Sequence, residues 1–180
     1  MLRLGVLVTG EPVEAVSRTR GGFADLIRGE LGARAGTVSV VDARTDSLER
    51  LGDFGAIVIT GSPESVTSRK PWIVEAERAV AALARAGTPT FGICFGHQLL
   101  AQALGGSVEK NPRGREIGSV EVELLERDPL FEGLPSPLLA NMSHRDSATL
   151  LPPGARVLAR TRLEPHAAVR FLPRAWGVQF

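Results

Sequence analysis

The stretch TPTFGICFGHQLLAQALGG, residues 88–106, holds the only cysteine of the 180-residue chain, Cys94. A free thiol can be a small buried apolar side chain, as most free cysteines are, or it can be a nucleophile. Cys94 ends an apolar run and opens a helical pattern. Because ligands bind beyond the carboxyl ends of the strands in an open α/β sheet, this position favours the nucleophile.

Two glycines frame the cysteine in GICFG. This is the spacing of the strand–turn–helix elbow in which hydrolases place a serine, and Gly92 and Gly96 would remove side chains that clash at the turn. The turn would lift the sulfur out of the sheet. Since the N-terminus of the following helix favours a negative charge, we expect the pKa of Cys94 to be lowered.

Thiolate attack on an amide carbon creates an oxyanion, which fixed backbone N–H groups stabilise. The N–H of Phe95, at the start of the helix, is one candidate donor. The N–H of Gly61 or Ser62 is the other, at the end of the apolar run GAIVITG (55–61). Pro63 has no N–H and can only stiffen this loop. The alternative for GSPES is an ordinary turn at the exit of a strand.

The elements that must position these groups alternate along the first half of the chain. Apolar runs predict strands at 2–8, 37–43, 55–61 and 88–94, and helical spacing predicts helices at 22–32, 71–87 and 95–106. The helix at 71–87 begins with proline and ends at glycine, the usual asymmetry. This alternation predicts an α/β fold with an open, mostly parallel sheet flanked by helices.

The second half of the chain has shorter apolar runs separated by turns that contain proline. These runs predict mainly antiparallel strands added to the sheet, at 118–125, 138–143, 155–161, 166–172 and 175–180. No repeat or linker divides the chain, so we predict a single domain over residues 1–180.

The composition limits the classes of function. Apolar residues make up 43% and charged residues 23%, with a net charge of +1, so nothing attracts the chain to nucleic acid or to a membrane. A single cysteine excludes an internal disulfide framework and a cysteine-rich zinc site. The start MLRLGVLVTG is too short for a signal peptide or a spanning helix. We expect a cytoplasmic protein with no cofactor and no metal.

GICFGHQLLAQALGG resembles the nucleophile segment of class I glutamine amidotransferases, which release ammonia from glutamine with a Cys-His-Glu triad. Three more stretches resemble this family in the same order along the chain. IVITGSPESV (57–66) is similar to its oxyanion loop, NMSHRDSATLLP (141–152) to its substrate loop, and WGVQF (176–180) to the strand before its catalytic histidine. The resemblance implies a flavodoxin-like, GMP-synthase-glutaminase-like domain.

The resemblance also implies roles for the side chains near the cysteine. Gln98, one helical turn after Cys94, would contact the substrate, although an exposed helix glutamine is the alternative. Ser143, His144 and Asp146 would hold the amino and carboxylate ends of glutamine. Arg145 stands where many members carry glycine.

The three histidines of the chain are not expected to act as the base for Cys94. We interpret His97 as structural, His166 as a surface residue and His144 as a positioning residue. In the family, His-Pro-Glu follows the strand that WGVQF resembles, and neither the His nor the Glu is present here. We therefore expect that the C-terminal end of the domain is missing and that the chain as it stands is inactive.

The resemblance implies that Cys94 attacks the side-chain amide of glutamine and releases ammonia through a γ-glutamyl thioester. The partner would be glutamine or a γ-glutamyl compound, with a synthetase domain or subunit to accept the ammonia. No GxxxxGK phosphate-binding loop occurs in the chain, so any synthetase activity needs another domain. A γ-glutamyl peptide hydrolase and a non-catalytic, amidotransferase-like binding or regulatory protein remain as alternatives.

Overall fold

The apolar runs of the first half form parallel strands in the computed structural model, which describes residues 3–32 and 36–180. Strand β1 pairs in parallel with β2 and with β3, and β3 pairs in parallel with β4. The predicted strands are therefore confirmed, while Leu2, at the edge of the first one, lies outside the described residues. Their bounds are Arg3–Val8 for β1, Thr37–Asp42 for β2, Ala56–Ile59 for β3 and Thr90–Ile93 for β4.

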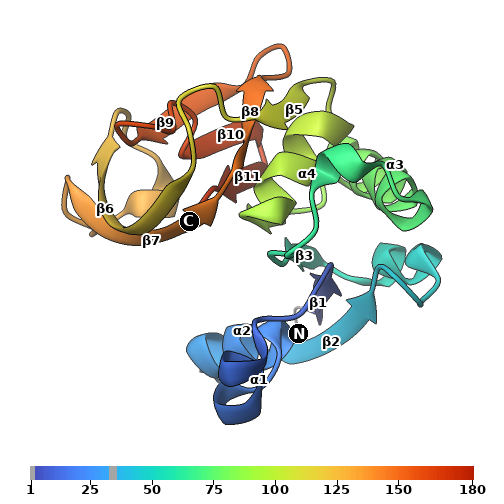
Figure 1. Cartoon of the computed structure of the whole chain (residues 1–180). Coiled ribbons are helices and arrows are strands. Elements are labelled where there is room, and N and C mark those ends of the chain that lie inside the picture. The colour runs from blue at the N-terminus through green and yellow to red at the C-terminus, as the bar shows by residue number, and fades with distance from the viewer. Residues whose placement is uncertain (1–2, 33–35) are drawn as a thin grey trace.

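Helices cover both faces of this sheet, with α1 and α2 across the strands from α3 and α4 (Figure 1). The predicted helices are present as α2 (Phe23–Leu31), α3 (Pro71–Arg85) and α4 (Phe95–Ala103). Helix α1 (Glu14–Arg20) was not predicted, because its sequence EAVSRTR has no apolar stripe and buries no residue. Short 3₁₀-helices lie at Leu48–Asp53 (η2), Val66–Ser68 (η3) and Pro129–Phe131 (η4).

The second half extends the same sheet with antiparallel strands, as predicted. Among the described residues, nine strands follow the order β2-β1-β3-β4-β11-β10-β9-β6-β7, and β5 and β8 form a separate pair. Strands β5 and β8 were not predicted. The bounds are Ser107–Lys110 (β5), Glu116–Leu124 (β6), Leu138–His144 (β7), Asp146–Leu150 (β8), Arg156–Arg160 (β9), Ala168–Leu172 (β10) and Ala175–Val178 (β11).

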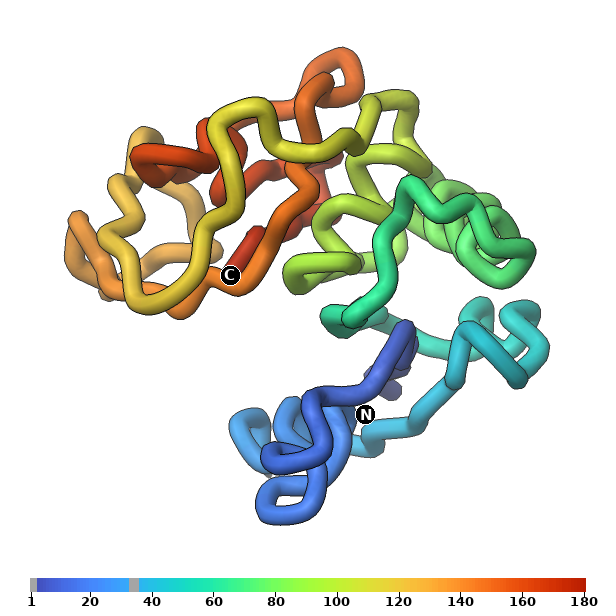
Figure 2. Tube along the Cα trace, in the orientation of Figure 1, coloured from blue at the N-terminus to red at the C-terminus, as the bar shows by residue number. Residues whose placement is uncertain are grey.

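Strand β11 has an unusual place for the last strand of a chain. It lies in the interior of the sheet, parallel to β4 and antiparallel to β10. Figure 2 shows these red strands between the green helix α4 and the orange segment of β7. The consequence is that the residues after β11, Gln179 and Phe180, emerge at the edge of the sheet where β4 leads into α4.

Candidate active site

Cys94 lies at the junction of β4 and α4, with the left-handed backbone angles φ 51° and ψ −101°. Such angles are rare for a residue with a side chain and occur where the surrounding structure enforces them. Two backbone hydrogen bonds hold the residue. Its N–H donates to Val178 O at 2.8 Å, and its C=O accepts from the N–H of Gln98 at 3.1 Å. The predicted elbow is therefore present.

The two glycines of the elbow are required by close backbone approach. A Cβ placed on Gly92 would lie 2.4 Å from the carbonyl carbon of Gly96, and one on Gly96 would lie 2.5 Å from Ile59 O. Both separations are far below van der Waals contact, and the atoms met are backbone atoms that cannot rotate away. The expected reason for glycine at these positions is confirmed.

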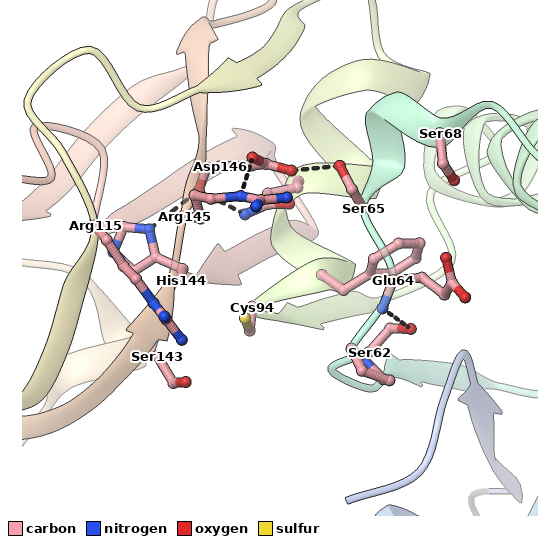
Figure 3. Close-up of a pocket in the computed structure, with 13 residues that line it drawn as sticks. Ser62, Glu64, Ser65, Ser68, Cys94, Arg115, Ser143, His144, Arg145 and Asp146 are labelled. Atoms are coloured by element: carbon pink, nitrogen blue, oxygen red, sulfur yellow. Dashed lines mark hydrogen bonds and ion pairs between the residues drawn. The ribbon is translucent and has the colours of Figure 1, made fainter.

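The elbow opens into a cavity of about 590 Å³. In Figure 3, Cys94 lies between the loop that carries Ser62 and Ser65 and the segment from Ser143 to Asp146. The cavity thus brings together three stretches that the sequence singled out separately. Its lining consists of Ser62, Pro63, Glu64, Ser65, Ser68, Cys94, Phe95, Gln98, Arg115, Ser143, His144, Arg145 and Asp146.

The loop after β3 lies beside the nucleophile because β3 and β4 are neighbouring parallel strands. A Cβ on Gly61 would lie 3.8 Å from the Cβ of Cys94. Within the described residues, no acceptor takes up the N–H of Gly61 or Ser62, and Phe95 is the first residue of α4, whose N–H has no partner inside the helix. Backbone N–H donors therefore lie on both sides of the sulfur.

Hydrogen bonds to the end of β1 hold this loop in place. Thr9 Oγ1 donates to Gly61 O at 3.1 Å, and Ser62 Oγ donates to Thr9 O at 2.8 Å. Ser62 Oγ also accepts from the N–H of Glu64 at 3.1 Å. Because the Gly61 carbonyl is fixed, the Ser62 N–H in the same peptide unit has a defined direction, as an anion-binding site requires.

Cys94 as a residue is half-buried, and its sulfur accepts a hydrogen bond from Gln179 Nε2 at 3.4 Å. Burial raises the pKa of the Cys94 thiol, and the opposing effects of the Phe95 N–H and the Gln179 amide are smaller. The predicted lowering of the pKa is therefore wrong for this structure, because removal of the thiolate from water outweighs the donors at the helix start.

Gln98 joins the nucleophile helix to the opposite wall of the cavity. It is only 5% exposed, and its Nε2 donates to Asp146 O at 2.9 Å and to Gln179 Oε1 at 3.0 Å. The alternative of an exposed helix glutamine is therefore wrong.

The segment from Ser143 to Asp146 spans the end of β7 and the start of β8, and all four of its residues line the cavity. Ser143 and Arg145 are exposed, whereas the Asp146 carboxylate accepts a short hydrogen bond from Ser65 Oγ. Arg145 Nε lies 3.8 Å from Asp146 Oδ1. The two loops on either side of Cys94 are therefore in direct contact through Ser65 and Asp146.

His144 points away from Cys94 into a buried polar cluster. Its Nδ1 lies 3.0 Å from Asp146 O, and its Nε2 lies 3.4 Å from Glu116 Oε2. Glu164 Oε2 is 3.8 Å from Nδ1, and all three side chains are at most 5% exposed. Because both ring nitrogens are engaged in the interior, His144 is not free to take a proton from Cys94.

Sequence reasoning missed Glu116 and Glu164, and it also missed Arg115 in the cavity wall. Thr161 Oγ1 donates to Glu116 at 2.8 Å, and Ser147 Oγ donates to Glu164 at 2.9 Å. Glu116 begins β6, and Glu164 lies in the loop before β10. Glutamate at such positions is usually solvated. Nothing in their spacing along the sequence signals burial.

The other two histidines also lie apart from the sulfur. His97 is fully buried and packs against Phe171, which supports its structural role. Burial lowers the pKa of His97 to about 3. His166 was expected at the surface, but it is half-buried and its Nδ1 lies 2.6 Å from Ala148 O. Across the described ranges, no histidine nitrogen contacts Cys94 Sγ.

Residues 3–32 and 36–180 contain neither a metal-binding group of side chains nor a membrane-spanning helix. No group of three or more His, Cys, Asp or Glu side chains is arranged to hold a metal ion. None of the helices in these ranges is both long and apolar enough to cross a lipid bilayer.

A family model described as "Glutamine amidotransferase class-I" matches residues 20–180. The chain is 44% identical over 139 residues to a glutamine-hydrolysing GMP synthase of Aeropyrum pernix, which covers 74% of this chain and 26% of that relative. A glutamine-hydrolysing GMP synthase of Thermus thermophilus is 44% identical over 128 residues, covering 69% of this chain and 24% of the relative. The chain thus spans about a quarter of the length of these curated relatives.

Solved structures of the same fold cover nearly the whole chain. A glutamine amidotransferase from Thermotoga maritima superposes with a TM-score of 0.83 at 22% identity, over 99% of this chain and 75% of that chain. A glutamine amidotransferase from Methylobacillus flagellatus superposes with a TM-score of 0.76 at 24% identity, over 99% and 68%. These likenesses confirm the open, mostly parallel sheet predicted from the alternation of strands and helices, and the flavodoxin-like architecture that the family resemblance implied.

Proposed function

Because the chain belongs to the class I glutamine amidotransferase family, we propose that it hydrolyses the side-chain amide of glutamine with Cys94 as the nucleophile. The observation that carries this proposal is the left-handed backbone of Cys94 at the mouth of the cavity. A strained cysteine on a strand–helix elbow, facing polar loops on two sides, suits attack on a polar carbonyl compound.

The reaction would begin when the Cys94 thiolate forms a bond to the amide carbon. The negative charge that develops on the amide oxygen would be stabilised by the N–H of Phe95 and by that of Gly61 or Ser62. Collapse of this intermediate breaks the C–N bond, and ammonia leaves once its nitrogen has accepted a proton. Attack of water on the resulting γ-glutamyl thioester then gives glutamate and restores the thiol.

The substrate would lie between the two loops that border the cavity. Gln98, Ser143 and Asp146 would bind the amino and carboxylate ends of glutamine, and His144 would position their segment from behind. This assignment is supported by the cavity lining and by the contact of Asp146 O with both Gln98 and His144.

The reaction needs a group that takes the thiol proton and delivers it to the leaving nitrogen. No histidine among the described residues reaches Cys94 Sγ. In the family this role belongs to the His and the Glu of a His-Pro-Glu motif, which the 180 residues do not contain. A segment that continued from Phe180 would start beside the sulfur, since Gln179 already contacts it.

The ammonia would pass to an acceptor bound by a synthetase domain or subunit. This proposal is supported by the similarity to glutamine-hydrolysing GMP synthases, of which the matched part of this chain covers only about a quarter. A cytoplasmic location, where nucleotide precursors are made, fits the same assignment.

The test is to measure glutamate formation from glutamine by this chain and by a version extended through a His-Pro-Glu segment. Loss of the base typically costs several orders of magnitude, so we expect turnover only from the extended version. Cys94→Ser in the extended version should abolish it. Robust turnover by the 180-residue chain would instead make His144 the first residue to mutate. No turnover by the extended version would contradict the proposed function.

A further inference from the structure

We propose that Gln179 is a positioning residue that ties the sulfur of Cys94 to the amide of Gln98, and thereby aligns the nucleophile with the substrate loop. This inference rests on the proposed function, since it assigns Gln179 a part in the same site. It extends the site to a residue whose side chain does not line the cavity.

Gln179 is held rigidly. It is 1% exposed, it directly follows β11, and its backbone N–H donates to Ala167 O at 2.8 Å. Its side-chain amide uses both ends, because Oε1 accepts from Gln98 Nε2 at 3.0 Å and Nε2 donates to Cys94 Sγ at 3.4 Å. A buried glutamine satisfied in this way has a single orientation.

Asp146 O, Gln98, Gln179 and Cys94 Sγ form a row of hydrogen bonds, and the backbone carbonyl at one end fixes which atoms of the row donate. Asp146 O can only accept, so the Gln98 atom 2.9 Å away must be the nitrogen. That nitrogen offers its second hydrogen to Gln179, so the facing atom of Gln179 must be its oxygen. The amide nitrogen of Gln179 is then the atom that faces the sulfur. The direction of the donor is therefore imposed by the substrate loop.

The same row determines what Gln98 presents to a ligand. With both hydrogens of its nitrogen engaged, its remaining polar atom is Oε1, which has no partner in the described residues and is not sealed from solvent. Because Gln98 lines the cavity, this oxygen is available as an acceptor for an N–H group of the substrate. Without Gln179 the Gln98 amide would lose one of the two bonds that set its orientation.

The donor from Gln179 has a measurable effect on the thiol. It stabilises the thiolate more than the thiol, because a charged acceptor forms the stronger hydrogen bond. It therefore acts against the burial that raises the pKa of Cys94. Replacing Gln179 with a residue of similar size that cannot donate should leave less thiolate at a given pH.

The experiment is the rate of alkylation by iodoacetamide across a pH series, on the 180-residue chain. Cys94 is the only cysteine, so the rate reports this thiol alone. For Gln179→Met and Gln179→Glu we expect the midpoint of the alkylation rate profile to shift to higher pH. At fixed pH below the midpoint the rate should fall about three- to tenfold, the worth of one hydrogen bond. The matched control is Gln102→Met, which removes an α4 glutamine bonded only to the N–H of Val108 and should leave the profile unchanged.

The sign of the change separates this role from a loss of folding, because unfolding exposes the thiol and makes alkylation faster. An unchanged or faster rate in both Gln179 variants would overturn the proposal. Failure of the proposed function is a different result, since it appears as absent glutamine turnover in the extended chain with Gln179 intact. An extended chain with normal turnover and Gln179 variants of unchanged alkylation would overturn the positioning role alone.

Discussion

At the scale of single residues, the site depends on the left-handed backbone of Cys94, which the two neighbouring glycines allow. A non-glycine residue in the left-handed region costs roughly 1–3 kcal/mol. The bonds from Cys94 to Val178 and Gln98 offset this cost and hold the sulfur toward the cavity. Gly92 and Gly96 contribute because, without side chains, they let the backbones of β4, α4 and β3 approach closely.

Substituting Gly92 with alanine should therefore disrupt the elbow. The added methyl would lie 2.4 Å from the backbone of Gly96, so the strand and the helix must separate. We expect a loss of roughly 2–3 kcal/mol in the free energy of unfolding, measured in urea. The control is Gly29→Ala in α2, where no heavy atom lies within 4 Å of the new methyl. That change should stabilise by up to about 1 kcal/mol. Equal effects of the two substitutions would contradict the close-packing account of the elbow.

At the scale of elements, helix α4 connects the nucleophile to the interior. Seven of its residues, from Phe95 to Ala101, are buried, and it packs on β4 and β11 and against α3. Even its polar residues point inward, with Gln98 in the cavity wall and His97 among the core side chains beside Phe171. A helix fixed on all sides holds the elbow rigid.

The buried imidazole of α4 should make the fold sensitive to acid. Burial lowers the pKa of His97 to about 3 from an ordinary value of 6.5, so between these values only the unfolded chain binds a proton there. The contribution of His97 to the free energy of unfolding should be complete above pH 6.5 and should fall by about 1.4 kcal/mol per pH unit below it.

Urea unfolding of the natural chain and of His97→Leu at about pH 7.5, 6 and 5 tests this directly. As the pH falls, the free energy of unfolding of the chain with His97 should decrease relative to that of His97→Leu. The carboxylates titrate in both proteins and cancel in the comparison. A difference that stays constant over this range would show that His97 can be protonated in the folded state.

At the scale of the whole molecule, the cavity is assembled from both halves of the chain. The parallel half supplies the elbow and the loop after β3, and the antiparallel half supplies the segment from Ser143 to Asp146. The bonds of Asp146 to Ser65 and to Gln98 connect the halves. Strand β11 completes the arrangement, because its position beside β4 brings Gln179 to the sulfur.

The parts that the sequence predicted are those written in local patterns. Buried parallel strands are continuous apolar runs, and helices such as α3 carry a proline start and a regular apolar stripe, so both were found within a few residues of their bounds. Cys94 was found because its glycine spacing is a local requirement of the elbow.

The parts that escaped are those that depend on distant packing. The burial of Glu116 and Glu164 arises only when β6, β7 and the turn before β10 meet around His144. Strands β5 and β8 pair only with each other, outside the main sheet. Neither contains a long apolar run, so the sequence carried no strand signal at these positions. The pKa of Cys94 was predicted in the wrong direction, because the helix start is a local feature of the sequence, whereas the burial that raises the pKa depends on how distant segments pack around the sulfur.

The most direct test of the central claim is covalent trapping of Cys94 by an electrophilic analogue of glutamine that carries a diazoketone in place of the side-chain amide. The modified protein would be digested and the adduct located by mass spectrometry. We expect one adduct, on Cys94, formed at least about tenfold faster by the L than by the D enantiomer and suppressed by excess L-glutamine. Equal labelling by both enantiomers that glutamine does not suppress, or no adduct on Cys94, would contradict the claim that this cavity presents glutamine to the cysteine.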